Sequence, residues 1–195
     1  MNLKDRLVKS MADNKVIDQD EIDVYRFGVQ LLSETVLSFV VFLIIAALFG
    51  SVTEFIIFTV AFALIRQYGG GFHASKFIYC LLISCGIVTL FCLLIRFAEL
   101  GSEHAAALSA ISIPTILILS PVDSKYKPIA EGDKKKYRNK LFVLLFVEVL
   151  AAVITAFVSM RFCMCIVLSW CALSGLLIAG DLINKKHFGG DVVNK

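Results

Sequence analysis

Apolar residues in this chain occur in six long blocks separated by short polar segments. The blocks cover roughly residues 32–49, 52–65, 77–95, 105–120, 141–160 and 162–180. Most approach the ~20 residues that an α-helix needs to cross the ~30 Å hydrocarbon core of a bilayer. A single block could be a buried helix of a soluble protein, but six in succession indicate a polytopic membrane protein. The predicted fold is therefore all-α, with about six transmembrane helices.

The second block, residues 52–65, is shorter than the others. At 1.5 Å per residue, a helix of this length covers about 21 Å, which is less than the hydrocarbon core. The helix would reach further if it continued to Tyr68 and if the Arg66 side chain extended toward the headgroups. The polar, glycine-rich segment that follows would then lie at the membrane surface.

The first 31 residues lack the apolar core and the small-residue cleavage site of a secretory signal peptide. Apolar residues recur there at helical spacing in two stretches. Between the stretches, Asp18 and Glu21 resemble a capping box. We therefore expect two amphipathic helices on the membrane surface, the second of which runs into the first span. Packing of these helices on the protein's own core is an equally good interpretation.

Composition agrees with a membrane protein. The chain is 58% hydrophobic with a mean hydropathy of +0.84, whereas soluble domains are typically about 45–50% apolar. The net charge of +3 is too small to indicate a nucleic-acid partner. The positions of the charges along the chain are more informative than their sum.

The charge distribution predicts the orientation in the membrane. Six spans place both termini on one side, together with the polar segments 66–80 and 121–140. Of the 19 lysines and arginines, only Arg96 and Arg161 would then lie on the opposite side. By the positive-inside rule, the termini and both polar segments are cytoplasmic. We thus predict one domain over residues 1–195 in the cell membrane, with surface helices to residue 31, a bundle over 32–180 and a cytoplasmic tail over 181–195.

The candidate chemistry lies in the glycine-rich break between the second and third spans. A free cysteine has a pKa of about 8.5, so a thiol needs a base to act as a nucleophile at neutral pH. An imidazole is the usual base. In one continuous helix, His73 and Cys80 would be about 10.5 Å apart along the axis, too far for a hydrogen bond. Because glycines 69–71 allow the backbone to leave the helix, we expect a turn that brings His73 toward Cys80, with Arg66 as a charged neighbour.

These residues also have ordinary interpretations. A cysteine in an apolar run usually packs as a small hydrophobic residue, and a histidine at an interface can simply reach toward water. The other five of the six cysteines have no nearby base, and we expect no disulfide framework. The pair Cys163 and Cys165 lacks a second pair of ligands, so no metal site is predicted. No nucleotide-binding motif occurs either, and no cofactor is expected.

Two acidic residues, Glu34 and Glu148, lie inside apolar runs, both in the predicted cytoplasmic half. Ionisable residues are costly in the membrane and are therefore functional hypotheses. Either acid could orient His73 or pair with Arg66. A hydrogen bond between helices, or a carboxyl that extends to the interface, is an equally good interpretation.

A second polar segment covers residues 121–140. Pro121 and Pro128 impose an extended turn at its start. Asp123 and Lys127 flank the start of this segment and could contact substrate or lipid. The lysine run that begins at Lys134 is most simply a contact with anionic lipid.

The combination of Arg66, Gly70-Gly71, His73 and Cys80 at these offsets resembles the signature of the accessory gene regulator B (AgrB) family. Residues 121–129, of sequence PVDSKYKPI, and the lysine-rich stretch after them resemble the cytoplasmic loop of the same family. The likeness extends over nearly the whole chain. No single part of it would be specific, but the combination is.

The resemblance implies a membrane cysteine endopeptidase that cleaves an AgrD-type pro-peptide and cyclises it to a thiolactone or lactone for quorum sensing. It also implies Cys80 as the nucleophile, His73 as the general base, and Arg66, Gly70 and Gly71 as supporting residues. The implied partners are the precursor peptide, membrane lipids and a second copy in a homodimer. Two other classes stay open on the residues alone: a small peptide transporter or exporter, and a non-catalytic membrane adaptor that uses the basic segment.

Overall fold

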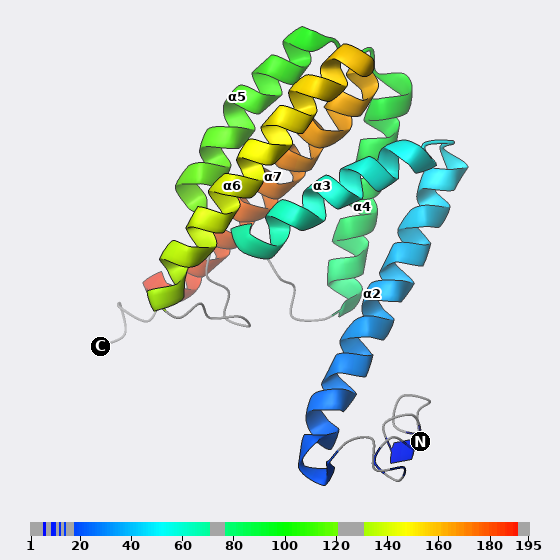
Figure 1. The fold of residues 1–195 in the computed structure, drawn as a ribbon, viewed down its shortest axis with the longest axis vertical. Coiled ribbons are helices and arrows are strands. Elements are labelled where there is room, and N and C mark those ends of the chain that lie inside the picture. Colours follow the sequence, from blue (N-terminus) through cyan, green and yellow to red (C-terminus); the bar gives the residue numbers. More distant parts are fainter. Residues whose placement is uncertain are drawn as a thin grey trace. The chain divides into compact units, whose positions relative to one another are not determined.

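The computed structural model describes residues 18–70, 77–120 and 131–190, together with residues 6, 9, 10, 12 and 14. Its elements, in order, are η1 (Gln19–Glu21), α2 (Ile22–Leu48), α3 (Val52–Gly69), α4 (Phe77–Phe97), α5 (Ser102–Leu119), α6 (Glu131–Val158) and α7 (Met160–Gly190) (Figure 1). Within these residues, six helices are long and apolar enough to cross a membrane. The predicted all-α, multi-pass architecture is confirmed.

The helix bounds differ from the expected ones near the N-terminus. The second amphipathic stretch and the first span form one continuous helix, α2, as expected. Asp18 occupies the N-cap position of η1, but in the described residues its side chain makes no capping hydrogen bond. The capping box predicted from Asp18 and Glu21 is therefore wrong, because the chain enters the helix through a 3₁₀ turn instead.

The last two helices are longer than the apolar blocks that predicted them. α6 begins at Glu131 rather than at residue 141, and α7 continues past residue 180 to Gly190. Lysine, arginine and glutamate are good helix formers. Extending an existing helix is also far less costly than nucleating a new one. Part of the predicted polar connector and of the predicted tail is therefore helical.

The chain divides into two compact units, Met1–Ile44 and Ile45–Lys195, and each is considered by itself. In the second unit, α7 is the central helix and contacts α3, α4, α5 and α6. Figure 1 shows α5 and α6 running beside α7, with α3 crossing them. Every residue of α7 from Cys163 to Trp170 is buried. A helix that is apolar all round is suited to such a central position.

Candidate functional site

The C-terminal end of α3 is closed by its own arginine. The Arg66 guanidinium donates a hydrogen bond to the carbonyl of Gly70. The Gly70 amide in turn donates to the Arg66 carbonyl, at 3.3 Å. A cation at this position meets the last unpaired carbonyls and the negative end of the helix dipole. The Arg66 side chain therefore stabilises the helix end from which the glycine break begins.

The two glycines at this end differ in conformation and surroundings. Gly70 has φ 73° and ψ −146°, a region that is essentially reserved for glycine. A Cβ atom built on Gly69 would lie 3.4 Å from Cδ2 of Leu173 on α7 and 3.5 Å from Oγ of Ser120 at the end of α5. Gly70 thus sets the direction of the chain, whereas the position of Gly69 has room for a Cβ atom in ordinary contact with its neighbours.

Cys80 lies near the start of α4 and is exposed, unlike the other cysteines. Cys85 and Cys171 are half-buried, and Cys92, Cys163 and Cys165 are buried. The buried residues of α4 all lie in its second half, from Val88 to Ile95. In the described part of the protein, the first half of α4 is therefore less covered than the second, and Cys80 is exposed there.

Arg66 and Cys80 come from the two helices on either side of the glycine break, and the two side chains interact electrostatically. The structure thus brings together three of the predicted site residues, Arg66, Gly70 and Cys80.

The other residues of the predicted site, His73, Gly71, Asp123 and Lys127, lie outside the described residues. The predicted turn that brings His73 toward Cys80 therefore stays a prediction. The same holds for the substrate or lipid contacts of Asp123 and Lys127.

The basic start of α6 contacts this end of α3 through aromatic rings. The rings of Tyr68 and Tyr137 have centroids 5.8 Å apart. Nζ of Lys140 lies 5.4 Å from the centroid of the Tyr68 ring, within the range of a cation–π interaction. From the sequence alone, the lysine run is most simply a contact with anionic lipid. Its proximity to the glycine break follows from the crossing of α3 and α6, for which the sequence has no local signal.

The two acidic residues within apolar runs, Glu34 and Glu148, each accept a hydrogen bond. Glu34 accepts a hydrogen bond from Gln30 within α2, at 2.9 Å. Glu148 on α6 is 5% exposed, and its Oε2 accepts a hydrogen bond from Nε1 of Trp170 on α7, at 2.7 Å. Glu148 thus forms a bond between helices, one of the two interpretations left open. A role of either acid in orienting His73 stays a prediction.

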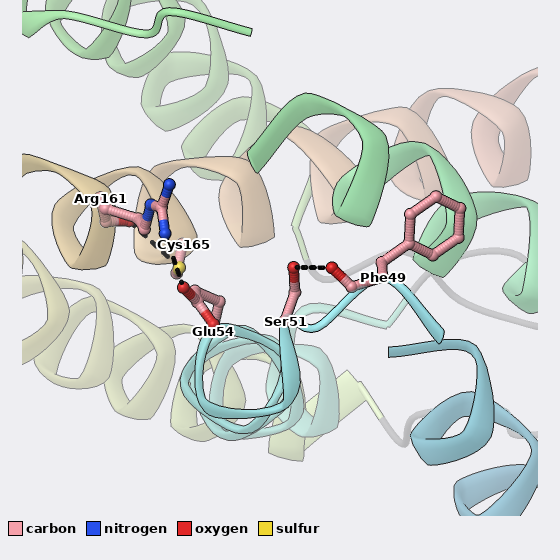
Figure 2. A network of polar contacts seen from close by, with 5 residues as sticks. All are labelled: Phe49, Ser51, Glu54, Arg161 and Cys165. Carbon is pink, nitrogen blue, oxygen red and sulfur yellow. Dashed lines mark hydrogen bonds and ion pairs between the residues drawn. The ribbon is translucent and has the colours of Figure 1, made fainter. Parts of the chain in front are cut away.

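A further buried acid, Glu54, was missed by the sequence analysis. Its Oε1 lies 3.4 Å from Nη1 of Arg161. This ion pair joins the first turn of α3 to the first turn of α7 (Figure 2). The Cys165 thiol beside this pair donates to the carbonyl of Arg161, at 3.2 Å. The sequence contains a signal for this pair. Arg161 is one of two cations predicted on the non-cytoplasmic side of the membrane, and Glu54 lies at the end of an apolar block on the same side.

Comparisons with known proteins agree with the resemblance. The family model described as Accessory gene regulator B matches residues 4–178. Two AgrB-like proteins of Clostridium perfringens, from strain 13 and strain SM101, are each 26% identical to this chain over 167 residues, which cover 78% of this chain and 77% of theirs. Accessory gene regulator protein B of Staphylococcus aureus strain MW2 is 23% identical over 157 residues, covering 80% of this chain and 82% of its own. No solved structure matches the chain.

Proposed function

This chain belongs to the accessory gene regulator B family, and we propose on that basis that it is a membrane cysteine endopeptidase of quorum sensing. Its substrate would be an AgrD-type precursor peptide, which it would cleave and cyclise to a thiolactone or lactone. The observation that carries the proposal is the placement of Cys80. Among the six cysteines it is the exposed one, it flanks the glycine break, and Arg66 supplies a neighbouring positive charge.

In the proposed reaction, His73 removes the proton from the Cys80 thiol, and the thiolate attacks the carbonyl carbon of one peptide bond of the precursor. The resulting oxyanion needs hydrogen-bond donors, which backbone amides of the glycine break or the Arg66 guanidinium could supply. His73 then returns the proton to the departing amine. The C-terminal fragment leaves, and the N-terminal part stays bound to Cys80 as a thioester.

In the second half of the reaction, a thiol or hydroxyl of the bound peptide attacks this thioester. A ring closes, and the Cys80 thiol is released. Cyclisation exceeds hydrolysis only if the site holds the internal nucleophile close to the thioester and limits the access of water. Forming a thioester from an amide is uphill, so removal of the cleaved fragment has to draw the reaction forward.

We place the reaction at the cytoplasmic face, where the charge distribution predicts both chain termini and the glycine break. The basic start of α6 lies beside that break through Tyr68 and Lys140. The segment with Asp123 and Lys127 that precedes it is proposed to contact the substrate or lipid headgroups. A homodimer, implied by the family resemblance, is part of the same proposal.

The test uses the purified full-length protein in liposomes with a synthetic AgrD-type precursor. Wild type should release the C-terminal fragment, and Cys80→Ala should not. Cys85→Ala is the matched control, because Cys85 lies on the same helix but is half-buried, and this variant should cleave normally. His73→Ala should block formation of the acyl-enzyme. Cleavage by correctly inserted Cys80→Ala protein would rule out the assignment.

A further inference from the structure

Among the side chains that the structure describes in the unit Ile45–Lys195, two carboxyl groups are buried, Glu54 and Glu148, and their surroundings differ in one respect. Glu54, 9% exposed, has a cation within reach, since Arg161 lies 3.4 Å away. Glu148, 5% exposed, receives a hydrogen bond from the uncharged indole of Trp170. In the described residues, the second oxygen of Glu148, Oε1, is buried and has no hydrogen-bond partner.

The position of Glu148 in the bundle makes an ionised carboxylate costly. The buried residues of α6 form one stripe, which faces α7 and α3. The stripe contains Leu141, Leu145, Glu148 and Ala152. An ionised carboxylate in such an apolar setting costs several kcal/mol even after relaxation, unless a cation and further hydrogen bonds compensate it.

The charged and titratable groups near Glu148 do not supply that compensation. On α7, the buried stretch from Cys163 to Trp170 contains two thiols, those of Cys163 and Cys165, and the half-buried Cys171 follows it. Arg161, before this stretch, is paired with Glu54. On α3, Glu54 lies in the first turn and Arg66 in the last turn. Arg66 donates to the Gly70 carbonyl. On α6 itself, the basic run ends at Lys140, eight residues away, or about 12 Å along the helix.

The hydrogen bond from Trp170 also indicates where a proton would reside. The indole N–H donates to Oε2, so Oε2 acts as the carbonyl oxygen of the acid. A proton on the carboxyl group then belongs to Oε1, the oxygen that has no donor in the described residues. In that state the carboxyl group carries no charge, and its accepting oxygen is satisfied.

We propose that Glu148 is a proton-binding site inside the membrane-spanning bundle, a carboxyl group that joins α6 to α7 through Trp170 and takes up a proton there. Glu54, by contrast, is paired with Arg161 at 3.4 Å. The proposal is independent of the proposed enzymatic function. Loss of the Glu148 proton would place an uncompensated charge between α6 and α7, so the folded protein should become less stable as the pH rises.

The direct test is infrared spectroscopy of the full-length protein in liposomes at pH 7. The wild-type spectrum minus that of Glu148→Gln should contain the carbonyl stretching band of a protonated carboxyl group. The corresponding difference for Glu54→Gln, the matched control, should contain carboxylate bands instead. A Glu148 difference spectrum with carboxylate bands and without the carbonyl band of a protonated carboxyl group would overturn the proposal.

Thermal unfolding against pH is the second measurement, and it separates the proposal from a merely structural role of Glu148. Glu148→Gln keeps an oxygen that accepts from Trp170 and cannot ionise. Wild type folds with Glu148 protonated, whereas the unfolded chain ionises this group near the ordinary glutamate pKa of about 4.3, so wild type loses stability as the pH rises above that value. Glu148→Gln cannot ionise and should not show this loss, so at pH 7 it should unfold at or above the wild-type temperature. The proposal is contradicted if wild type and Glu148→Gln lose stability equally with rising pH. It is also contradicted if Glu148→Gln is as unstable at pH 7 as Glu148→Ala.

Discussion

The backbone of Gly70 supports a quantitative test of how the glycine break is built. Its φ of 73° with ψ −146° lies where residues with a side chain are strained. Holding such a residue there costs on the order of 1–3 kcal/mol. A Gly70→Ala chain can avoid this cost by adopting another backbone conformation at residue 70. Since 1.4 kcal/mol corresponds to a factor of ten, the native conformation at residue 70 would then lose population by a factor of roughly 5–150.

The preceding glycine is the matched control. A Cβ atom on Gly69 would make ordinary contacts of 3.4 Å with Leu173 and 3.5 Å with Ser120, and Gly69 is not among the glycines with positive φ. The assay is the initial rate of precursor cleavage in liposomes by each variant. We expect Gly70→Ala to lower the rate at least about fivefold, as the lower estimate of strain requires, and Gly69→Ala to change it less. Equal losses in both variants would refute this account of the break.

Three further predictions follow from the same geometry. A maleimide reagent should modify Cys80 faster than the other cysteines in folded protein, because it is the exposed thiol; equal rates would contradict that placement. In a double-mutant cycle of thermal stability, Glu54→Gln and Arg161→Gln should be coupled by about 1 kcal/mol or less, because the Arg161 side chain is 50% exposed. A coupling of zero would show that the pair adds nothing to stability. Tyr68→Leu should remove the cation–π contact with Lys140 and cost about 0.5–1 kcal/mol, whereas Lys140→Arg should retain most of it.

The helices were predictable from the sequence because the bilayer leaves few alternatives. A backbone in hydrocarbon has to satisfy its hydrogen bonds internally, so a block of apolar residues of sufficient length becomes a helix. The ends of the helices were less predictable. α6 continues N-terminally to Glu131 through lysines, because charged residues that favour helices extend a span without changing its apolar pattern.

The site was predictable in part. Arg66 and Cys80 were singled out by their place beside three glycines, and the structure brings the two side chains within electrostatic range of each other. The ion pair of Glu54 with Arg161 and the cation–π contact of Lys140 with Tyr68 join helices that are distant in sequence. Such contacts depend on crossing angles and depths in the bundle, which hydrophobic patterns do not specify.

The central claim is that the Cys80 sulfur becomes covalently attached to the precursor. The most direct measurement is mass spectrometry of the protein, quenched in acid during turnover of a synthetic AgrD-type precursor and then digested. The account predicts a thioester between the N-terminal part of the precursor and the fragment that contains Cys80, which is lost on treatment with hydroxylamine. A precursor that is processed while the adduct forms on another cysteine, or while no cysteine is acylated, would contradict it.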